Sequence, residues 1–144
     1  MRLVLALLMG CTTTTSSLPP TCELSALELS VETAWPGVRV TAHTTPMTTA
    51  WDTVVTVGSQ RAEVDTVERD GCEACDACTE ANACSTCGIT CAACVDACAA
   101  CDESVVFVVP DLDGGRHDVV VRNGVGSSPR AALTVTGMSD TAAP

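Results

Sequence analysis

Cysteine is the residue type in this chain with the greatest capacity for chemistry. The 144 residues include 11 cysteines. Cysteines spaced as C-x-x-C or C-x-x-x-C can form disulfides, bind a soft metal ion or take part in redox catalysis. Nine of them are concentrated between residues 72 and 101: Cys72, Cys75, Cys78, Cys84, Cys87, Cys91, Cys94, Cys98 and Cys101.

The first eleven residues have the pattern of a bacterial export signal. Arg2 supplies one positive charge and the seven residues from Leu3 to Met9 are apolar, far fewer than the roughly 20 that span a bilayer. The run Leu8-Met9-Gly10-Cys11 resembles the bacterial lipobox, in which a small residue precedes the cysteine that receives a diacylglycerol. We expect residues 1–10 to be a signal peptide and Cys11 to be lipidated.

Residues 11–21 predict a flexible tether, because residues 12–21 lack periodicity and Pro19-Pro20 favours an extended backbone. Acyl chains on Cys11 would hold the protein stably on a membrane. Thr12 stands where enteric lipoproteins that remain in the inner membrane carry Asp, so the pattern resembles an outer-membrane address. The expected location is therefore the bacterial cell envelope, with a lipid anchor in the outer membrane.

The number of remaining cysteines favours disulfides. With Cys11 lipidated, Cys22 and the nine cysteines of segment 72–101 make an even set, which outside the cytosol favours up to five bonds. Neighbours three or four apart on a helix have Cβ atoms about 5–6 Å apart, whereas a disulfide requires about 3.5–4.5 Å. We therefore predict bonds between two arms of the segment, with Cys22 joining it to the first strand.

The spacing also predicts a small helical hairpin that turns near Asn82. Its first arm carries three cysteines at intervals of three: Cys72, Cys75 and Cys78. Its second arm carries six at alternating intervals of three and four, which places them on one face of a helix: Cys84, Cys87, Cys91, Cys94, Cys98 and Cys101.

Metal binding by the same cysteines is the alternative, since repeated C-x-x-C can hold Zn²⁺, Cu⁺ or an iron–sulfur cluster. Six acidic residues and no basic residue accompany them, so thiolates would need a cation to offset their charge: Glu73, Asp76, Glu80, Asp96, Asp102 and Glu103. No histidine lies in the segment, and the Cys-Pro ending of bacterial ferredoxins is missing. We expect no cofactor; a thiol oxidoreductase is the third hypothesis, but its usual α/β context is missing.

Outside segment 72–101, short runs of alternating apolar and polar residues are separated by turns such as Pro36-Gly37 and Asn123-Gly124. Seven strands with such turns predict an all-β chain with an immunoglobulin-like β-sandwich over residues 22–137, followed by a disordered tail at 138–144. The expected strands lie at 27–31, 38–42, 53–57, 62–67, 105–109, 118–122 and 131–136.

Several motifs resemble the IPT/TIG family of immunoglobulin-like domains. The resemblance implies a module that mediates contacts or spaces other domains, without catalytic residues. The sequence departs from the family at 45–51, where a Gly-Asn-aromatic-Gly turn is usual. The motifs are Pro36-Gly37-Val38-Arg39-Val40-Thr41, the Val-Thr-Val-Gly end of a strand at 55–58, the Val-Pro strand end at 105–110, the Gly-to-Asn run at 115–123, and Gly126-Ser127.

Isolated polar and aromatic residues offer no further site. We expect His43 and His117 to be surface or edge residues and the run 111–114 to be a plain turn without the Glu that a calcium loop requires. Trp35 and Trp51 are expected to pack against the sandwich; exposed, they would instead mark a binding patch.

The charge restricts the partners. A net charge of −11 repels phosphate backbones, which argues against nucleic-acid binding. The sequence therefore predicts a monomeric, non-enzymatic structural, adhesion or binding module, whose partner is another envelope protein or a surface glycan. The alternative is a metal-sequestering envelope protein.

Overall fold

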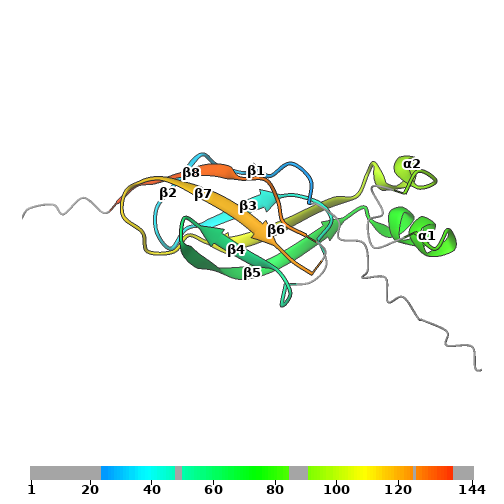
Figure 1. Cartoon of the computed structure of the whole chain (residues 1–144), viewed down its shortest axis with the longest axis horizontal. Helices are drawn as coiled ribbons and strands as arrows, with labels where there is room; N and C mark the ends of the chain where they lie inside the picture. Colours follow the sequence, from blue (N-terminus) through cyan, green and yellow to red (C-terminus); the bar gives the residue numbers. More distant parts are fainter. Residues whose placement is uncertain (1–23, 48–49, 85–90, 125, 138–144) are drawn as a thin grey trace, which may run out of the picture.

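The computed structural model describes residues 24–47, 50–84, 91–124 and 126–137. They form one curled, mixed sheet of eight strands in the order β1-β3-β6-β5-β4-β7-β8-β2, with two helices beyond one end of it (Figure 1). All neighbouring strands are antiparallel except β2 and β8. The strands are β1 (Glu28–Leu29), β2 (Thr33–Ala34), β3 (Arg39–His43), β4 (Val54–Val57), β5 (Gln60–Asp70), β6 (Asp102–Val108), β7 (Gly115–Arg122) and β8 (Ala131–Val135).

The strands form where the sequence alternates, because one side chain in two then reaches the interior. Burial alternates along β3 and along β4, where Val55 and Val57 are buried and their neighbours are half-buried. Each of the seven expected runs overlaps a strand, and β2 is an additional one. The mostly-β prediction is therefore confirmed.

The core of the sheet is aliphatic apart from one aromatic ring. Phe107 and Leu133 are the largest of its fully buried side chains, and valines from β3, β4, β6 and β7 surround them. No cysteine belongs to this cluster. Burial of apolar surface, without cysteine in the cluster, therefore holds the sheet together.

The cysteine-rich segment lies where it was expected, between β5 and β6, and its helices project past the ends of these two strands (Figure 1). Helix α1 (Glu73–Ala81) forms the first arm and ends at the C-cap Asn82, before Ala83 adopts a positive φ of 47°. The predicted turn near Asn82 is therefore correct.

The predicted continuous helix of the second arm is wrong. In the described part of that arm only α2 (Val95–Cys98) is α-helical. Cys84 and Cys91 have Cα atoms 5.8 Å apart, whereas an α-helix separates residues seven apart by about 10.5 Å along its axis. Cys84 and Cys91 therefore do not lie on one continuous helix.

The expectation that both tryptophans are packed against the sheet is also wrong. Trp51 is 84% exposed and Trp35 is 53% exposed. Trp51 precedes β4 near the end that carries the helices, whereas Trp35 lies beside the Pro36-Gly37 turn, whose Gly37 bonds to Val109 past the opposite end of β6. The two side chains are exposed but do not form a single patch.

Candidate functional site

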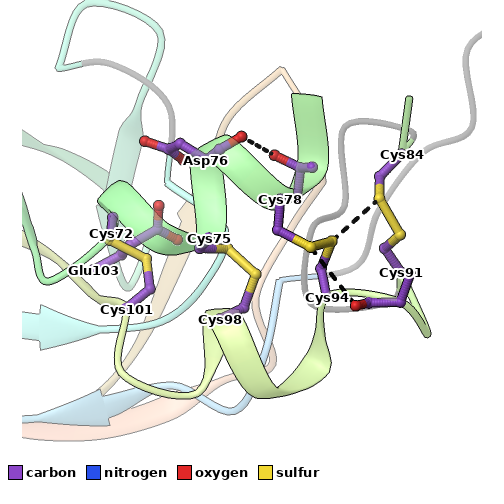
Figure 2. The surroundings of a disulfide bond; sticks show 12 residues. Cys72, Cys75, Asp76, Cys78, Cys84, Cys91, Cys94, Cys98, Cys101 and Glu103 are labelled. Carbon is purple, nitrogen blue, oxygen red and sulfur yellow. Dashed lines mark hydrogen bonds between the residues drawn. A yellow bond between two sulfur atoms is a disulfide. The ribbon is translucent and has the colours of Figure 1, made fainter. Parts of the chain in front are cut away.

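The described disulfides form a nested series of rungs, of which three join the two arms of the hairpin and the outermost lies within the second arm (Figure 2). From one pair to the next, the first cysteine lies later in the sequence and its partner lies earlier. Bonds between arms were predicted, and the structure confirms them for six cysteines, whereas the fourth pair lies within the predicted second arm. The pairs are Cys72–Cys101, Cys75–Cys98, Cys78–Cys94 and Cys84–Cys91. We call residues 72–101 the disulfide hairpin.

Three of the predicted cysteine sites remain predictions. The lipidation site Cys11, and Cys22 and Cys87 among the disulfide candidates, lie outside the described residues, as do the signal peptide, the tether and the tail at 138–144. The pairing of Cys22 with the hairpin is therefore untested.

The ladder of disulfides continues the register of the sheet. The last paired residues of β5 and β6 are Asp70 and Asp102, and the first rung follows directly, with Cα atoms of Cys72 and Cys101 4.2 Å apart. Cys72 also contacts the carbonyl oxygens of Asp70 and Asp102 through its sulfur. The insertion is therefore the covalently closed tip of the β5–β6 strand pair.

Sulfur takes the place of an apolar core in the hairpin. The buried cluster consists of Cys75, Cys94 and Cys98, with further cysteines packed around it. Cys94 is fully buried (0% exposed), whereas Val95 is 54% exposed. The arms are thus held by bonds between them, since little aliphatic surface is buried in the described part of the hairpin.

An ion-pair network at the base attaches α1 to the sheet. Arg69 on β5 donates through Nε to Oε1 of Glu103 at 2.6 Å and through both terminal nitrogens to Asp76 at 2.8 and 3.1 Å. Glu103 is only 3% exposed, and its other oxygen accepts the N–H of Met47. A buried carboxylate is tolerated here because both of its oxygens have donors.

The network also shifts two ionisation equilibria. The hydrogen bonds from Arg69 hold the pKa of the Asp76 carboxyl below its ordinary value. The bond to Asp76, followed by the contacts with Glu103, raises the pKa of the Arg69 guanidinium further above neutrality. Asp76 and Glu103 were considered only as negative charges near the cysteines, and their partner Arg69 was missed. No local pattern signals Arg69, because β5 runs past the expected strand at 62–67 and its register shifts between Val64 and Thr66.

The cysteines that could hold a metal are occupied by disulfides. Two groups bring ligand atoms within 4.8 Å of one another in the described residues: Cys84, Cys91 and Cys94, and Cys72, Cys101 and Glu103. Every cysteine in these groups is in a disulfide. Since the thiolate is the form that binds metal, these groups could do so only after reduction.

The histidines and the turn have ordinary structural contacts. His43 Nδ1 lies 3.4 Å from a carboxylate oxygen of Asp102, and His117 Nε2 lies 2.9 Å from the carbonyl oxygen of Asp113. Both rings are half-buried. Neither histidine nor the turn at 111–114 belongs to a group of possible metal ligands in the described residues.

Sequence reasoning missed a basic groove on the outer side of β4 and β7. Arg116 and Arg122 line it from β7, and Arg130 lines it from the segment before β8. Arg130 is paired with Asp118 at 2.9 Å. The even spacing of Arg116 and Arg122 on one strand face is the signal that could have revealed it, because such positions share a side of the sheet.

Comparisons with known proteins do not assign a family. The chain matches no protein-family model and none of the curated proteins with which it was compared. No helix in the described ranges has the length and apolar character that crossing a bilayer would demand.

Proposed function

We propose that this chain is a lipid-anchored protein of the bacterial cell envelope that presents the disulfide hairpin as a contact element. The observation that carries the proposal is the ladder of disulfides between the arms, which fixes a projecting structure that has almost no apolar core. Disulfides persist in oxidising compartments, which agrees with export directed by residues 1–10.

The body of the protein is proposed to be an immunoglobulin-like sandwich of the IPT/TIG type. In support of this, a curled sheet with mostly antiparallel neighbours surrounds one apolar core, and its strands coincide with the motifs that resemble the family. Such a body would act as a rigid support, and the hairpin at its end would reach a partner.

The proposed activity is binding, as a structural or adhesion module, and the partner is another envelope protein or a surface glycan. The hairpin exposes acidic residues on both arms, including Glu73 and Asp96, and carries no basic residue. Exposed Trp51 lies near the same end of the sheet. An acidic surface beside an exposed aromatic ring suits a partner with basic and apolar groups.

Lipid attachment is tested by metabolic labelling with an alkyne analogue of palmitate, followed by fractionation of the envelope. We expect the wild-type chain to be labelled and membrane-bound, and the Cys11→Ala variant to be unlabelled. Cys22→Ala is the matched control, because it removes a nearby cysteine that the proposal does not lipidate. Equal labelling of Cys11→Ala and wild type would refute the anchor.

The competing functions are separated by analysis of the purified native protein. A binding module stapled by disulfides should contain neither free thiols at the eight bridged cysteines nor stoichiometric metal. Bound Zn, Cu or Fe with free thiols would instead support metal sequestration. Sustained reduction of insulin in the presence of a dithiol would support a thiol oxidoreductase.

A further inference from the structure

The two outermost rungs of the disulfide hairpin are in contact through their sulfur atoms. Cys84 Sγ lies 3.7 Å from Cys94 Sγ, although Cys84 is bonded to Cys91 and Cys94 to Cys78 (Figure 2). A sulfur of one disulfide is therefore placed beside a sulfur of the next. Exchange between disulfides proceeds by attack of a thiolate on such a sulfur.

Access from solvent differs between the two rungs. Cys84 and Cys91 are both half-buried, whereas Cys94 is fully buried. An external thiol can thus reach the outermost rung and the half-buried Cys78, but it cannot reach Cys94 Sγ. Cys84, already in contact with that atom, has the advantage of an intramolecular nucleophile.

The sulfur that would leave has polar partners in place. The side-chain amide of Asn82 lies 3.4 Å from Cys78 Sγ and 3.7 Å from Cys94 Sγ, and the carbonyl oxygen of Ala93 lies 3.6 Å from Cys78 Sγ. The amide can donate to a thiolate on Cys78, and the carbonyl can accept from its thiol. Both protonation states of a released Cys78 are therefore accommodated.

We propose that the hairpin tip is a thiol-exchange site that accepts an external dithiol and transfers the reduction from Cys84–Cys91 to Cys78. The dithiol reduces the outer bond in two exchange steps, becomes a disulfide itself, and leaves thiols on Cys84 and Cys91. Cys84, as a thiolate, then attacks Cys94 Sγ. The Cys84–Cys94 bond forms, the Cys78–Cys94 bond breaks, and Cys78 takes up the proton that Cys84 lost.

The site goes beyond the proposed binding function and depends on neither the lipid anchor nor the sandwich fold. Its consequence is that reduction at the tip releases a thiol on α1, one rung closer to the sheet. The inner rungs Cys75–Cys98 and Cys72–Cys101 lie outside this exchange, so the base of the hairpin stays closed.

Two matched variants of the full chain test the proposal without any reductant. Cys91→Ser leaves Cys84 with a permanent thiol, and Cys84→Ser leaves Cys91 with one. After alkylation with iodoacetamide and mapping of the modified residues, we expect label on Cys78 and Cys84 in the Cys91→Ser protein. Cys78 should carry at least several-fold less label in the Cys84→Ser protein. Label confined to Cys84, or equal labelling of Cys78 in both variants, overturns the assignment.

Partial reduction of the wild-type chain gives an independent reading if a variant does not fold. One equivalent of dithiothreitol followed by alkylation should modify Cys78 and Cys91. Cleavage after Glu80 leaves the Cys78 peptide joined to the segment with Cys84 and Cys94 through Cys75–Cys98, so the label on Cys78 itself reports the loss of the Cys78–Cys94 bond. If Cys84 is alkylated instead of Cys78, the exchange does not occur.

Discussion

Strands β5 and β6 connect the sheet to the disulfide hairpin, yet different interactions stabilise these two regions. The sheet buries a cluster of valines around Phe107 and Leu133 that contains no cysteine. The hairpin buries a cluster made only of cysteines and leaves Val95 exposed. Since β5 and β6 run from one region into the other, the change in composition between Asp70 and Cys72 marks a change in the source of stability.

The difference has a practical meaning for a projecting structure. A hairpin that reaches away from the body has too few neighbours to bury much apolar surface, and a nine-residue helix is too short to be stable alone in water. Bonds between the arms solve this problem without an apolar core. They also make the hairpin sensitive to reductants that leave the sheet unchanged.

Removing all eight bridging cysteines should have the largest effect. With these residues replaced by alanine, we expect α1 to lose its hydrogen-exchange protection completely while the sheet still unfolds cooperatively. The free energy of unfolding of the sheet should fall by about 3–4 kcal/mol, because Cys72–Cys101 no longer closes a loop across a sequence separation of 29. A protected α1, or loss of protection in β7, would contradict the comparison.

A cavity in the core should destabilise the sheet and leave the disulfide hairpin intact. Phe107→Ala is expected to lower the free energy of unfolding by about 3–5 kcal/mol, because a fully buried ring is removed. Denaturant titration measures this loss, and peptide mapping should show the same four disulfides. The control is Val108→Ala, a half-buried neighbour on the other side of β6. An equally large loss for the control would argue against the core as described.

The junction between the regions depends on Arg69. Arg69→Ala should lower the free energy of unfolding by about 1–3 kcal/mol, because the buried Glu103 carboxylate loses a charged donor. The matched control is Arg39→Ala, since the pair of Arg39 with Asp65 is exposed and should contribute at most about 1 kcal/mol. Equal losses, measured by denaturant titration, would show that burial of Glu103 is unimportant.

Acid should loosen α1 from the sheet by a smaller amount. The pKa of Asp76 is lowered by the hydrogen bonds from Arg69, so its contribution is present above the ordinary carboxyl value and is lost as the pH falls through the lowered one. We therefore expect α1 amide signals to shift below about pH 4 in an NMR titration. Asp76→Asn is the control, and an unchanged transition in this variant would assign it to another group.

Sequence reasoning succeeded where a local rule determines the structure. The alternation around Val55 and Val57 predicted a strand because a sheet sorts side chains by parity. Bonds between arms followed from the distance between Cβ atoms on one helix. Three of the four described pairs, among them Cys75–Cys98, join the two arms as this rule predicted.

Prediction from the sequence failed where long-range packing determines the structure. Intervals of three and four predicted one continuous helix, and the Cys84–Cys91 bond, a long-range feature, rules this helix out. The exposure of Trp51 could not be derived either, because valine, leucine and Phe107 already fill the core. The contact between Arg69 and Glu103 depends on the register of β5 against β6, which one-dimensional patterns leave undetermined.

The short distance between the two ends of the hairpin makes the segment modular. The chain leaves β5 and enters β6 at adjacent residues in the register, so replacing residues 72–101 with a two-residue turn would keep the connectivity of every other strand. The same geometry would let the segment be grafted onto any antiparallel strand pair with a free end. Evolution or a designer can thus replace this tip while keeping the domain that carries it.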